Sequence, residues 1–254
     1  MLLEVRNVSL SFGGVMALSE VSFSVEENTL HALIGPNGSG KTSIFNVMSG
    51  IYKPQKGHIL MRGEDIGHAK PHQRAKMGLA RTFQNIELFK HMSVLENLLL
   101  GRHTQLQSGV FSGLLWIGRT LREEIQHREQ VERVIGLLEI ERWRNHLVST
   151  IPYGIQKRVE LGRALAMDPK ILLLDEPCAG MNVEETEDLA RFIIDIREEW
   201  GKTVLLVEHD MNVVMDISDT VTVLDFGHKI AEGSPKDVQK DPDVIKAYLG
   251  EEVT

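Results

Sequence analysis

A glycine-rich segment in the first fifth of the chain carries residue types that bind phosphate groups. Residues 35–42 read GPNGSGKT and match the pattern G-x-x-x-x-G-K-[ST]. In this pattern the glycines let consecutive main-chain N–H groups turn toward one anion, the lysine reaches the terminal phosphates of a nucleotide, and the last hydroxyl binds Mg²⁺. We therefore predict that a nucleotide is bound by Gly35, Pro36, Asn37, Gly38, Ser39, Gly40, Lys41, Thr42 and the adjacent Ser43.

An acidic pair follows another apolar run, where a second set of reactive groups is expected. Residues 171–174 read ILLL and are followed by Asp175 and Glu176. A phosphate-binding loop needs a carboxylate for Mg²⁺ at the end of a neighbouring buried strand, and Asp175 is suited to that role. Glu176 is placed to polarise an attacking water as a general base. Four apolar residues before an acid are a common strand ending, but together with the loop they predict nucleotide hydrolysis.

The surrounding pattern predicts a helix-covered, mostly parallel sheet. The phosphate-binding loop lies between the apolar run 30–34 and a helical pattern from residue 41 to 48, which is the setting that its motif requires. From residue 170 onward, strand and helix patterns alternate. Residues 2–10 and 21–25 predict a β-rich opening, and the middle of the chain predicts helices at 93–100, capped by Ser93 and Glu96, and at about 121–140.

Composition excludes several other classes of protein. The chain has 254 residues, of which 42% are apolar and 25% charged, with a formal charge of −8. This length allows one large domain or one core with an inserted subdomain, and no apolar run approaches the roughly 18 residues of a membrane-spanning helix. The first residues lack a secretory signal pattern and a single cysteine fits a reducing compartment, so we expect a cytoplasmic protein. The net negative charge argues against nucleic acid as the main partner.

Further motifs occur in an order that resembles the ATP-binding cassette (ABC) ATPases over essentially the whole chain. They are Phe83-Gln84, the stretch 153–166 ahead of the acidic pair, and Val207-Glu-His209-Asp after the next predicted strand. The resemblance implies an α/β fold, a P-loop NTPase cassette with a RecA-like, mostly parallel sheet. It also implies an N-terminal antiparallel β layer and an inserted α-helical subdomain. One ABC ATPase domain would span 1–254, with residues 1–86 and 165–254 as catalytic core and β layer, and 87–164 as the helical subdomain.

The resemblance also implies roles for single residues, with ATP and Mg²⁺ as cofactors. Phe12 matches the aromatic residue that stacks on adenine, although a core residue at a strand end is the alternative. Gln84 resembles the glutamine that contacts Mg²⁺ or water and senses the membrane partner, and His209 resembles the histidine that touches the γ-phosphate and orients the attacking water. The expected catalytic residues are Glu176, His209, Gln84 and Lys41, and the expected metal ligands are Thr42, Gln84 and Asp175.

The signature sequence departs from the family pattern. In ABC ATPases two subunits meet head to tail, and each ATP lies between one P-loop and the partner's signature, typically LSGGQ. Residues 151–155 here read IPYGI, so proline replaces the serine and isoleucine replaces the glutamine. Tyr153 and Gly154 remain as residues that would contact the partner's nucleotide. The resemblance then predicts a heterodimer with a second cassette that has an intact signature; a homodimer that tolerates both replacements is the alternative.

Five stretches narrow the resemblance to LivG-type ATPases of bacterial branched-chain amino acid importers: residues 10–18, 81–89, 92–97, 111–115 and 241–250. This resemblance implies a second, LivF-like ATPase, two membrane permeases and a periplasmic solute-binding protein as partners. It places the chain peripherally on the cytoplasmic face of the inner membrane. The solute is chosen by the other subunits, so an importer of urea or short amides stays open. A lipopolysaccharide-export ATPase and, less favoured, a soluble non-transport ABC ATPase are further alternatives.

Two segments have open roles. Residues 85–90 are the expected contact for a permease, with Phe89 as either an exposed apolar anchor or a core residue. Residues 105–119 are aromatic and apolar, punctuated by serine and glycine, and are interpreted as an inserted surface hairpin or loop. Packing within the protein and contact with a membrane partner are the two alternatives for that segment.

Overall fold

Two β-sheets form the framework of the computed structural model, which describes residues 1–82, 86–102 and 119–249, without the side chains of 119–123 and 249. The four-stranded sheet has the order β2-β1-β4-β5 and the six-stranded sheet the order β10-β9-β3-β8-β7-β6. The strands are β1 (Leu3–Phe12), β2 (Val15–Val25), β3 (Leu30–Ile34), β4 (Lys56–Met61), β5 (Glu64–Asp65), β6 (Leu79–Arg81), β7 (Ile171–Asp175), β8 (Thr203–Val207), β9 (Thr220–Asp225) and β10 (His228–Gly233).

The pairing of the strands confirms the predicted fold class. In the six-stranded sheet, β3, β6, β7, β8 and β9 pair in parallel, and only β10 pairs antiparallel, at the edge beside β9. All pairs of the N-terminal sheet are antiparallel. The second strand is longer than predicted because the chain turns at Gly13 and Gly14 and then pairs with β1 along its whole length, from Phe12↔Val15 to Leu3↔Val25.

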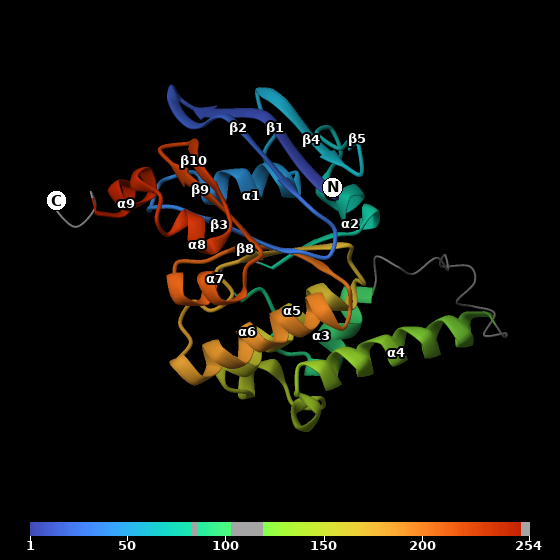
Figure 1. Ribbon diagram of the computed structural model, residues 1–254. Helices are drawn as coiled ribbons and strands as arrows, with labels where there is room; N and C mark the ends of the chain where they lie inside the picture. The colour runs from blue at the N-terminus through green and yellow to red at the C-terminus, as the bar shows by residue number, and fades with distance from the viewer. Residues whose placement is uncertain (83–85, 103–118, 250–254) are drawn as a thin grey trace.

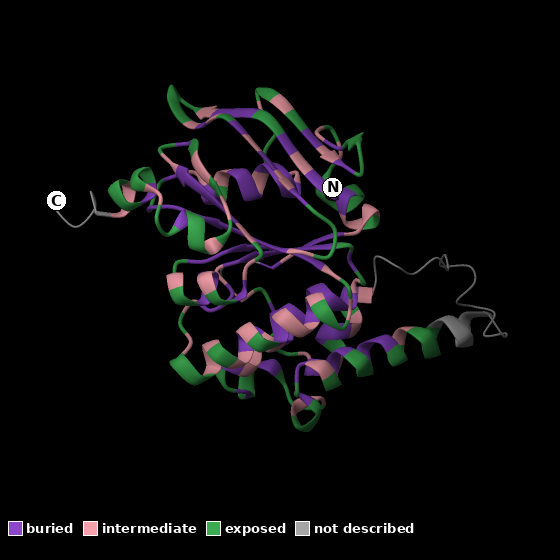
Figure 2. Ribbon diagram, in the orientation of Figure 1, coloured by how far each residue is buried: buried purple, intermediate pink, exposed green. Residues whose placement is uncertain are grey.

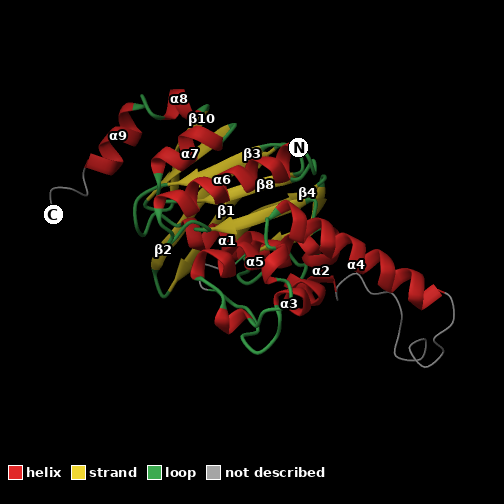
Figure 3. Ribbon diagram, turned by 90° about the horizontal axis from the view of Figure 1, so that it is seen from below, coloured by secondary structure: helices red, strands yellow, loops and turns green. Residues whose placement is uncertain are grey.

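Helices cover both faces of the six-stranded sheet. Figure 1 shows α1 between the two sheets, with α3 to α6 on the opposite face of the larger sheet. Figure 3 shows the same helical layer from below, with α4 extending beyond its neighbours. The α-helices are α1 (Lys41–Ser49), α2 (Pro71–Met77), α3 (Val94–Gly101), α4 (Arg119–Leu137), α5 (Tyr153–Ala166), α6 (Val183–Glu198), α7 (Met211–Ile217), α8 (Pro235–Val238) and α9 (Pro242–Leu249), and short 3-10 turns span Glu141–Trp143 and Val148–Thr150.

The buried residues of the central strands alternate between two hydrophobic cores. Leu172 and Leu174 of β7 pack with the helical layer, whereas Ile171 and Leu173 pack with α1 and the N-terminal sheet. This is the period of two that a strand buried on both faces must have. Figure 2 shows the resulting continuous band of buried residues along the central strands. The short apolar runs of the sequence therefore become the middle layer, and their ends carry the polar groups.

Capping residues set the start of α3 as predicted. The Ser93 side chain accepts from the Glu96 main-chain N–H at 3.2 Å, and the Glu96 carboxylate accepts from the Ser93 N–H at 2.7 Å. The predicted helix at 121–140 instead ends at Leu137, because Glu139 has a φ of 54°, which no α-helix accommodates.

Within the described part of the chain, no helix is both long and apolar enough to cross a membrane. The segment 105–119, interpreted above as an inserted hairpin or loop, lies outside the described residues from 105 to 118.

Candidate nucleotide-binding site

The predicted phosphate-binding loop, residues 35–42, is called the P-loop below. It lies between β3 and α1, as its motif requires. Gly40, directly before α1, has a φ of 106°, and a Cβ at this position would lie 2.7 Å from the Ala17 carbonyl oxygen. Glycine is therefore needed there for both conformation and space. Lys41 donates from Nζ to the carbonyl oxygens of Gly35 at 2.6 Å and Pro36 at 2.9 Å, so its ammonium lies over the loop.

One buried hydroxyl in this loop supports the assignment of phosphate as its ligand. The Ser39 side chain is buried, and its Oγ has no hydrogen-bond partner among the described residues. A buried polar atom without a partner is rare and costs stability, so such an atom at a helix N-terminus fits an anion that supplies the missing bond. The loop therefore offers Ser39 Oγ, the Lys41 ammonium and main-chain N–H groups to nucleotide phosphates.

The acidic pair and the predicted histidine meet at the adjacent ends of β7 and β8. Parallel pairing sets Asp175 beside Val207, and the Glu176 N–H donates to the Val207 carbonyl oxygen at 2.9 Å. Glu176 has a φ of 49°, which turns the chain sharply at the end of β7. Its Oε1 lies 2.6 Å from Nε2 of His209. The structure thus brings the predicted general base and the predicted orienting histidine into direct contact.

A buried carboxylate that sequence reasoning missed holds these two loops together. Glu208 accepts from the Cys178 N–H at 2.8 Å through Oε1 and from the His209 N–H at 3.1 Å through Oε2. Its position between the buried strand β8 and His209 was the available signal. Burial, followed by the neighbouring Glu208, raises the pKa of the Cys178 thiol above its ordinary value, so the cysteine packs in its neutral form.

The oxygen donors near the loop fit Mg²⁺. Thr42 offers a hydroxyl at the start of α1, and Asp175 is a buried carboxylate at the end of β7. The described residues contain no group of three or more His, Cys, Asp or Glu side chains able to hold a metal ion. Mg²⁺ usually takes one or two protein oxygens and completes its shell with phosphate and water, so Thr42 and Asp175 are a suitable donor set. Gln84, the third predicted ligand, lies outside the described residues.

An aromatic pair stands at the end of the first strand. Phe12 is 46% exposed, so the alternative that it is a core residue is wrong. Its ring lies edge-to-face against Tyr52, with centroids 5.2 Å apart. Tyr52 donates its main-chain N–H to the Asn46 carbonyl oxygen of α1, which ties the pair to the helix that begins in the P-loop. Sequence reasoning missed Tyr52 because its only signal is an aromatic residue shortly after the end of a helix.

The signature region begins α5 and touches the loop after the acidic pair. Pro152 is the N-cap and supplies no side-chain hydrogen bond to the helix. The Tyr153 hydroxyl donates to the Ala179 carbonyl oxygen at 3.1 Å, and a Cβ at Gly154 would lie 2.3 Å from Glu185 Oε1. Among the described residues, no hydrogen bond joins Tyr153 or Gly154 to residues 35–43. These two predicted contacts are therefore separate from the chain's own P-loop.

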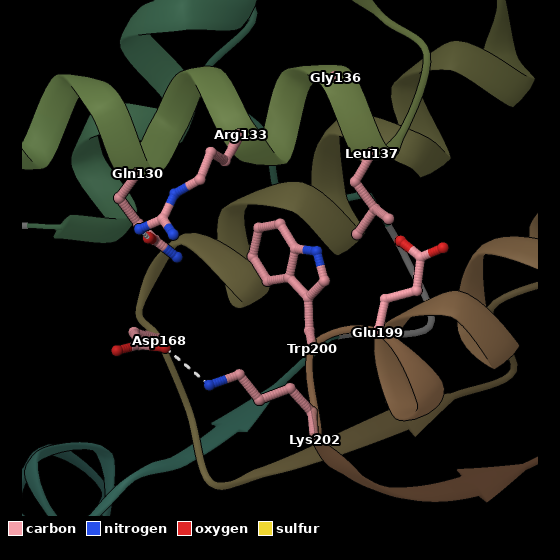
Figure 4. A pocket seen from close by; sticks show the side chains of 8 residues that line it. All are labelled: Gln130, Arg133, Gly136, Leu137, Asp168, Glu199, Trp200 and Lys202. Carbon is pink, nitrogen blue, oxygen red and sulfur yellow. Dashed lines mark hydrogen bonds and ion pairs between the residues drawn. The ribbon is translucent and has the colours of Figure 1, made fainter.

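Two cavities lie at opposite ends of the parallel strands. One of about 540 Å³ is lined by Pro36 to Ser39 and by residues of β9, β10 and α9, so it adjoins the P-loop. The other, of about 640 Å³, lies between α4 and the chain ahead of β7 and β8, with Trp200 pointing into it beside the Asp168–Lys202 ion pair (Figure 4). Because Asp168 and Lys202 precede their strands, this larger cavity is at the edge opposite to Glu176 and His209, away from the site described above.

Comparison with known families identifies the chain. The family model described as ABC transporter matches residues 18–179, which is more than half of the sequence. The chain belongs to the ABC transporter family. A second model, described as branched-chain amino acid ATP-binding cassette transporter, matches residues 228–254. The cassette is accordingly an ATP-hydrolysing enzyme, which confirms the predicted reaction class.

Individual relatives match the cassette over nearly its whole length. It is 43% identical to the high-affinity branched-chain amino acid transport ATP-binding protein LivG of Escherichia coli K12, with 98% of both chains covered. It is 42% identical to BraF of Pseudomonas aeruginosa, again over 98% of both. The lipopolysaccharide export ATP-binding protein LptB of Haemophilus influenzae is 33% identical, with 99% of the cassette and 98% of LptB covered. Among solved structures, the ADP conformation of the cassette MJ1267 is 32% identical, with a TM-score of 0.85 and 98% of both chains covered.

Proposed function

We propose that the cassette is the ATP-hydrolysing subunit of an importer for branched-chain amino acids, bound at the cytoplasmic face of the inner membrane through permease subunits. The hydrolytic part rests on the 2.6 Å contact between Glu176 Oε1 and His209 Nε2 at the sheet edge that carries the P-loop. The assignment of branched-chain amino acids as the solute rests on 42–43% identity to LivG and BraF, over 98% of each chain.

Phosphate binding is the first step that these residues would perform. Lys41 now donates to two loop carbonyl oxygens, and its ammonium would exchange these for the β- and γ-phosphate oxygens. Ser39 and Ser43 would add hydroxyl donors, and the main-chain N–H groups of residues 35–40 would complete the cradle. Phe12, which is 46% exposed and packs edge-to-face with Tyr52, would stack on the adenine ring.

Water activation is the role proposed for the acidic end of β7. Glu176 would accept a proton from the water that attacks the γ-phosphate, and His209 would orient that water and stabilise the Glu176 carboxylate. Glu208 keeps the main chain of both loops in place through its bonds to Cys178 and His209. Thr42, Asp175 and Gln84 would hold Mg²⁺, which supplies charge neutralisation of the phosphates when bound.

A second cassette would complete the active unit. Pro152 has no hydroxyl and Ile155 no amide, so two polar contacts of an LSGGQ signature are missing from this chain. Tyr153 and Gly154 retain main-chain N–H groups at the start of α5, which would bind a partner's phosphate more weakly. The proposed partner is therefore a LivF-like cassette that brings an intact signature to the complete P-loop of this chain.

The membrane partners are proposed to dock near Phe89. Its side chain is 57% exposed, so the alternative that it belongs to the core is wrong. The buried Asn97 fixes this position, because it accepts from the Phe89 N–H at 2.9 Å and donates to the Phe89 carbonyl oxygen at 3.1 Å. Two permeases, receiving solute from a periplasmic binding protein, would complete the importer. An exposed apolar side chain on a fixed main chain suits a coupling contact.

Uptake by the organism that carries this gene tests the proposal. Deletion of the gene is expected to abolish high-affinity uptake of radiolabelled leucine, isoleucine and valine. The wild-type gene should restore uptake, and a Lys41→Ala gene should not, because the loop then lacks its phosphate-binding cation. Loss of urea or short-amide uptake with normal leucine uptake would mean that the cassette belongs to a related importer. A defect confined to lipopolysaccharide export would favour the LptB-like alternative, to which the 33% identity already gives weaker support.

A further inference from the structure

An arginine to which sequence analysis assigned no role is buried against the predicted magnesium carboxylate. Arg81 ends β6, and its side chain is only 9% exposed. Its Nη2 donates to Asp175 Oδ2 at 2.8 Å, forming an ion pair whose carboxylate is also buried. Parallel pairing of β6 with β7 brings the two residues together, although they are 94 positions apart in the sequence.

The same guanidinium is also fixed to the helix that follows the P-loop. Arg81 Nη1 donates to Asn46 Oδ1 at 2.7 Å and to Ser49 Oγ at 2.8 Å. The guanidinium carbon lies 5.7 Å from the centre of the Phe45 ring. Asn46, Ser49 and Phe45 all belong to α1, which begins with Lys41 and Thr42. The planar fork of arginine therefore fixes Asp175 relative to the predicted Thr42 metal ligand.

The positive charge of Arg81 also bears on metal binding at Asp175. A buried carboxylate without a positive partner costs several kcal/mol, and Arg81 supplies that partner before any metal is bound. Mg²⁺ at Asp175 would place a second cation against the same carboxylate. Two cations that share one partner repel each other strongly in a buried site, where the effective dielectric constant is low. Arg81 should therefore oppose metal binding unless nucleotide phosphates bring further negative charge.

We propose that Arg81 is a positioning residue that acts on Mg²⁺ through Asp175: it holds the carboxylate in place and, as a competing cation, weakens metal binding at this site. Mg²⁺ then binds well only together with nucleotide, so metal without nucleotide does not occupy the site. This inference rests on the proposed function, because it requires Asp175 to be a ligand of Mg²⁺. It concerns metal affinity, which can be measured without hydrolysis.

Calorimetric titration of the full chain with ADP, in EDTA and in MgCl₂, tests the inference. The measured quantity is the ratio of the Kd in EDTA to the Kd in MgCl₂, which reports how strongly Mg²⁺ supports ADP binding. Arg81→Met removes the competing charge, so the ratio should rise about tenfold relative to wild type. Arg81→Gln, which keeps a hydrogen-bonding side chain, should raise it similarly if the methionine variant fails to fold. Arg81→Lys, which keeps the charge, should stay within about twofold of wild type.

Arg74→Met is the matched control. Arg74 is also a buried arginine that contacts α1, but its hydrogen bonds go to the main-chain carbonyl oxygens of Val47, Met48, Gly67 and Ala69. Its removal should lower stability and leave the ratio unchanged. An unchanged or lower ratio in both neutral Arg81 variants would overturn the inference. Failure of the wild-type chain to bind ADP at all would instead refute the proposed function, so the two failures are distinguishable.

Discussion

Two regions of the cassette differ in how many polar groups they offer to a nucleotide. The P-loop end comprises residues 35–43 with Asp175, Glu176 and His209, and the signature end comprises residues 151–155. The P-loop end combines Lys41, a Ser39 hydroxyl that has no hydrogen-bond partner within the described part of the chain, and the Glu176–His209 pair. The signature end begins α5 with a proline N-cap that makes no side-chain hydrogen bond, followed by a tyrosine that is already bonded to the Ala179 carbonyl oxygen. One end is therefore built for chemistry, and the other offers little beyond main-chain N–H groups.

This difference matters because both ends are needed at each ATP of a head-to-tail pair. A homodimer would combine the strong P-loop end with the weak signature end at both of its sites. A heterodimer would give the P-loop of this chain a better signature and leave the weak signature against the partner's P-loop. The asymmetry within one chain thus predicts unequal ATP sites in the assembled pair.

Replacement of the general base is the largest expected effect. Glu176→Gln removes the proton acceptor but keeps the shape of the side chain and a hydrogen-bonding partner for His209. ATP turnover by the pair of this chain with the proposed LivF-like partner should fall at least about a hundredfold, while ATP binding persists. Turnover is measured by phosphate release, and accumulation of the ATP-bound pair by size-exclusion chromatography.

Glu129→Gln is the control for this substitution, because Glu129 is exposed on α4 and changes the net charge by the same amount. It should leave turnover unchanged. If Glu176→Gln retained turnover within about threefold of wild type, another residue would have to be the base, and the P-loop end would lose its assigned chemistry.

Repair of the signature should reduce the difference between the two ends. The isolated chain is expected to hydrolyse ATP slowly, and Pro152→Ser with Ile155→Gln should raise its turnover about tenfold or more. The reason is that each charge-assisted hydrogen bond to phosphate is worth about 1.5–3 kcal/mol. Phosphate release by the isolated chain, measured against chain concentration, gives the effect.

Pro152→Ala is the matched control for the repair, because it removes the proline ring without adding a hydroxyl. It should leave turnover near the wild-type value. Cooperative and rapid turnover by the wild-type chain alone would favour the homodimer alternative, in which Pro152 and Ile155 are tolerated.

Local patterns were sufficient to predict the central elements of the fold. The strands β3, β7 and β8 are short apolar runs, and the helix α3 begins at the expected cap, Ser93. Boundaries that depend on tertiary structure were missed. β2 is extended by its pairing with β1, and α4 ends early at the positive φ of Glu139. Neither effect has a signal in local hydrophobic periodicity.

The candidate site shows the same division between local and distant information. Glu176 was found because it follows directly on a buried strand, and His209 because the motif Val207-Glu-His209-Asp at the end of the next strand resembles the family pattern. The ion pair of Arg81 with Asp175 depends on β6 lying beside β7, and strand order is not visible in a single sequence. Glu208 was missed for a related reason, since its two main-chain partners come from different loops.

The last expected effect concerns the stability of the strand that leads into the P-loop. His31 lies on β3, is 1% exposed, and has Nε2 2.9 Å from Thr222 Oγ1. Burial, helped by the charge of Lys229, lowers the pKa of His31 to about 4, against about 6.5 in the unfolded chain. Between these values the unfolded state binds the extra proton, so stability decreases as pH falls from about 6.5 to about 4. Lowering the pH from 7 to 5 should cost about 2 kcal/mol through this group.

Urea unfolding at pH 7, 6 and 5 measures this contribution. His31→Gln should lower stability at pH 7, because the packing against Phe23 and Thr222 changes, yet lose about 2 kcal/mol less than wild type between pH 7 and pH 5. His72→Gln, at an exposed position on α2, should keep the wild-type pH dependence. Equal pH dependence in wild type and His31→Gln would mean that His31 is not held neutral beneath the P-loop.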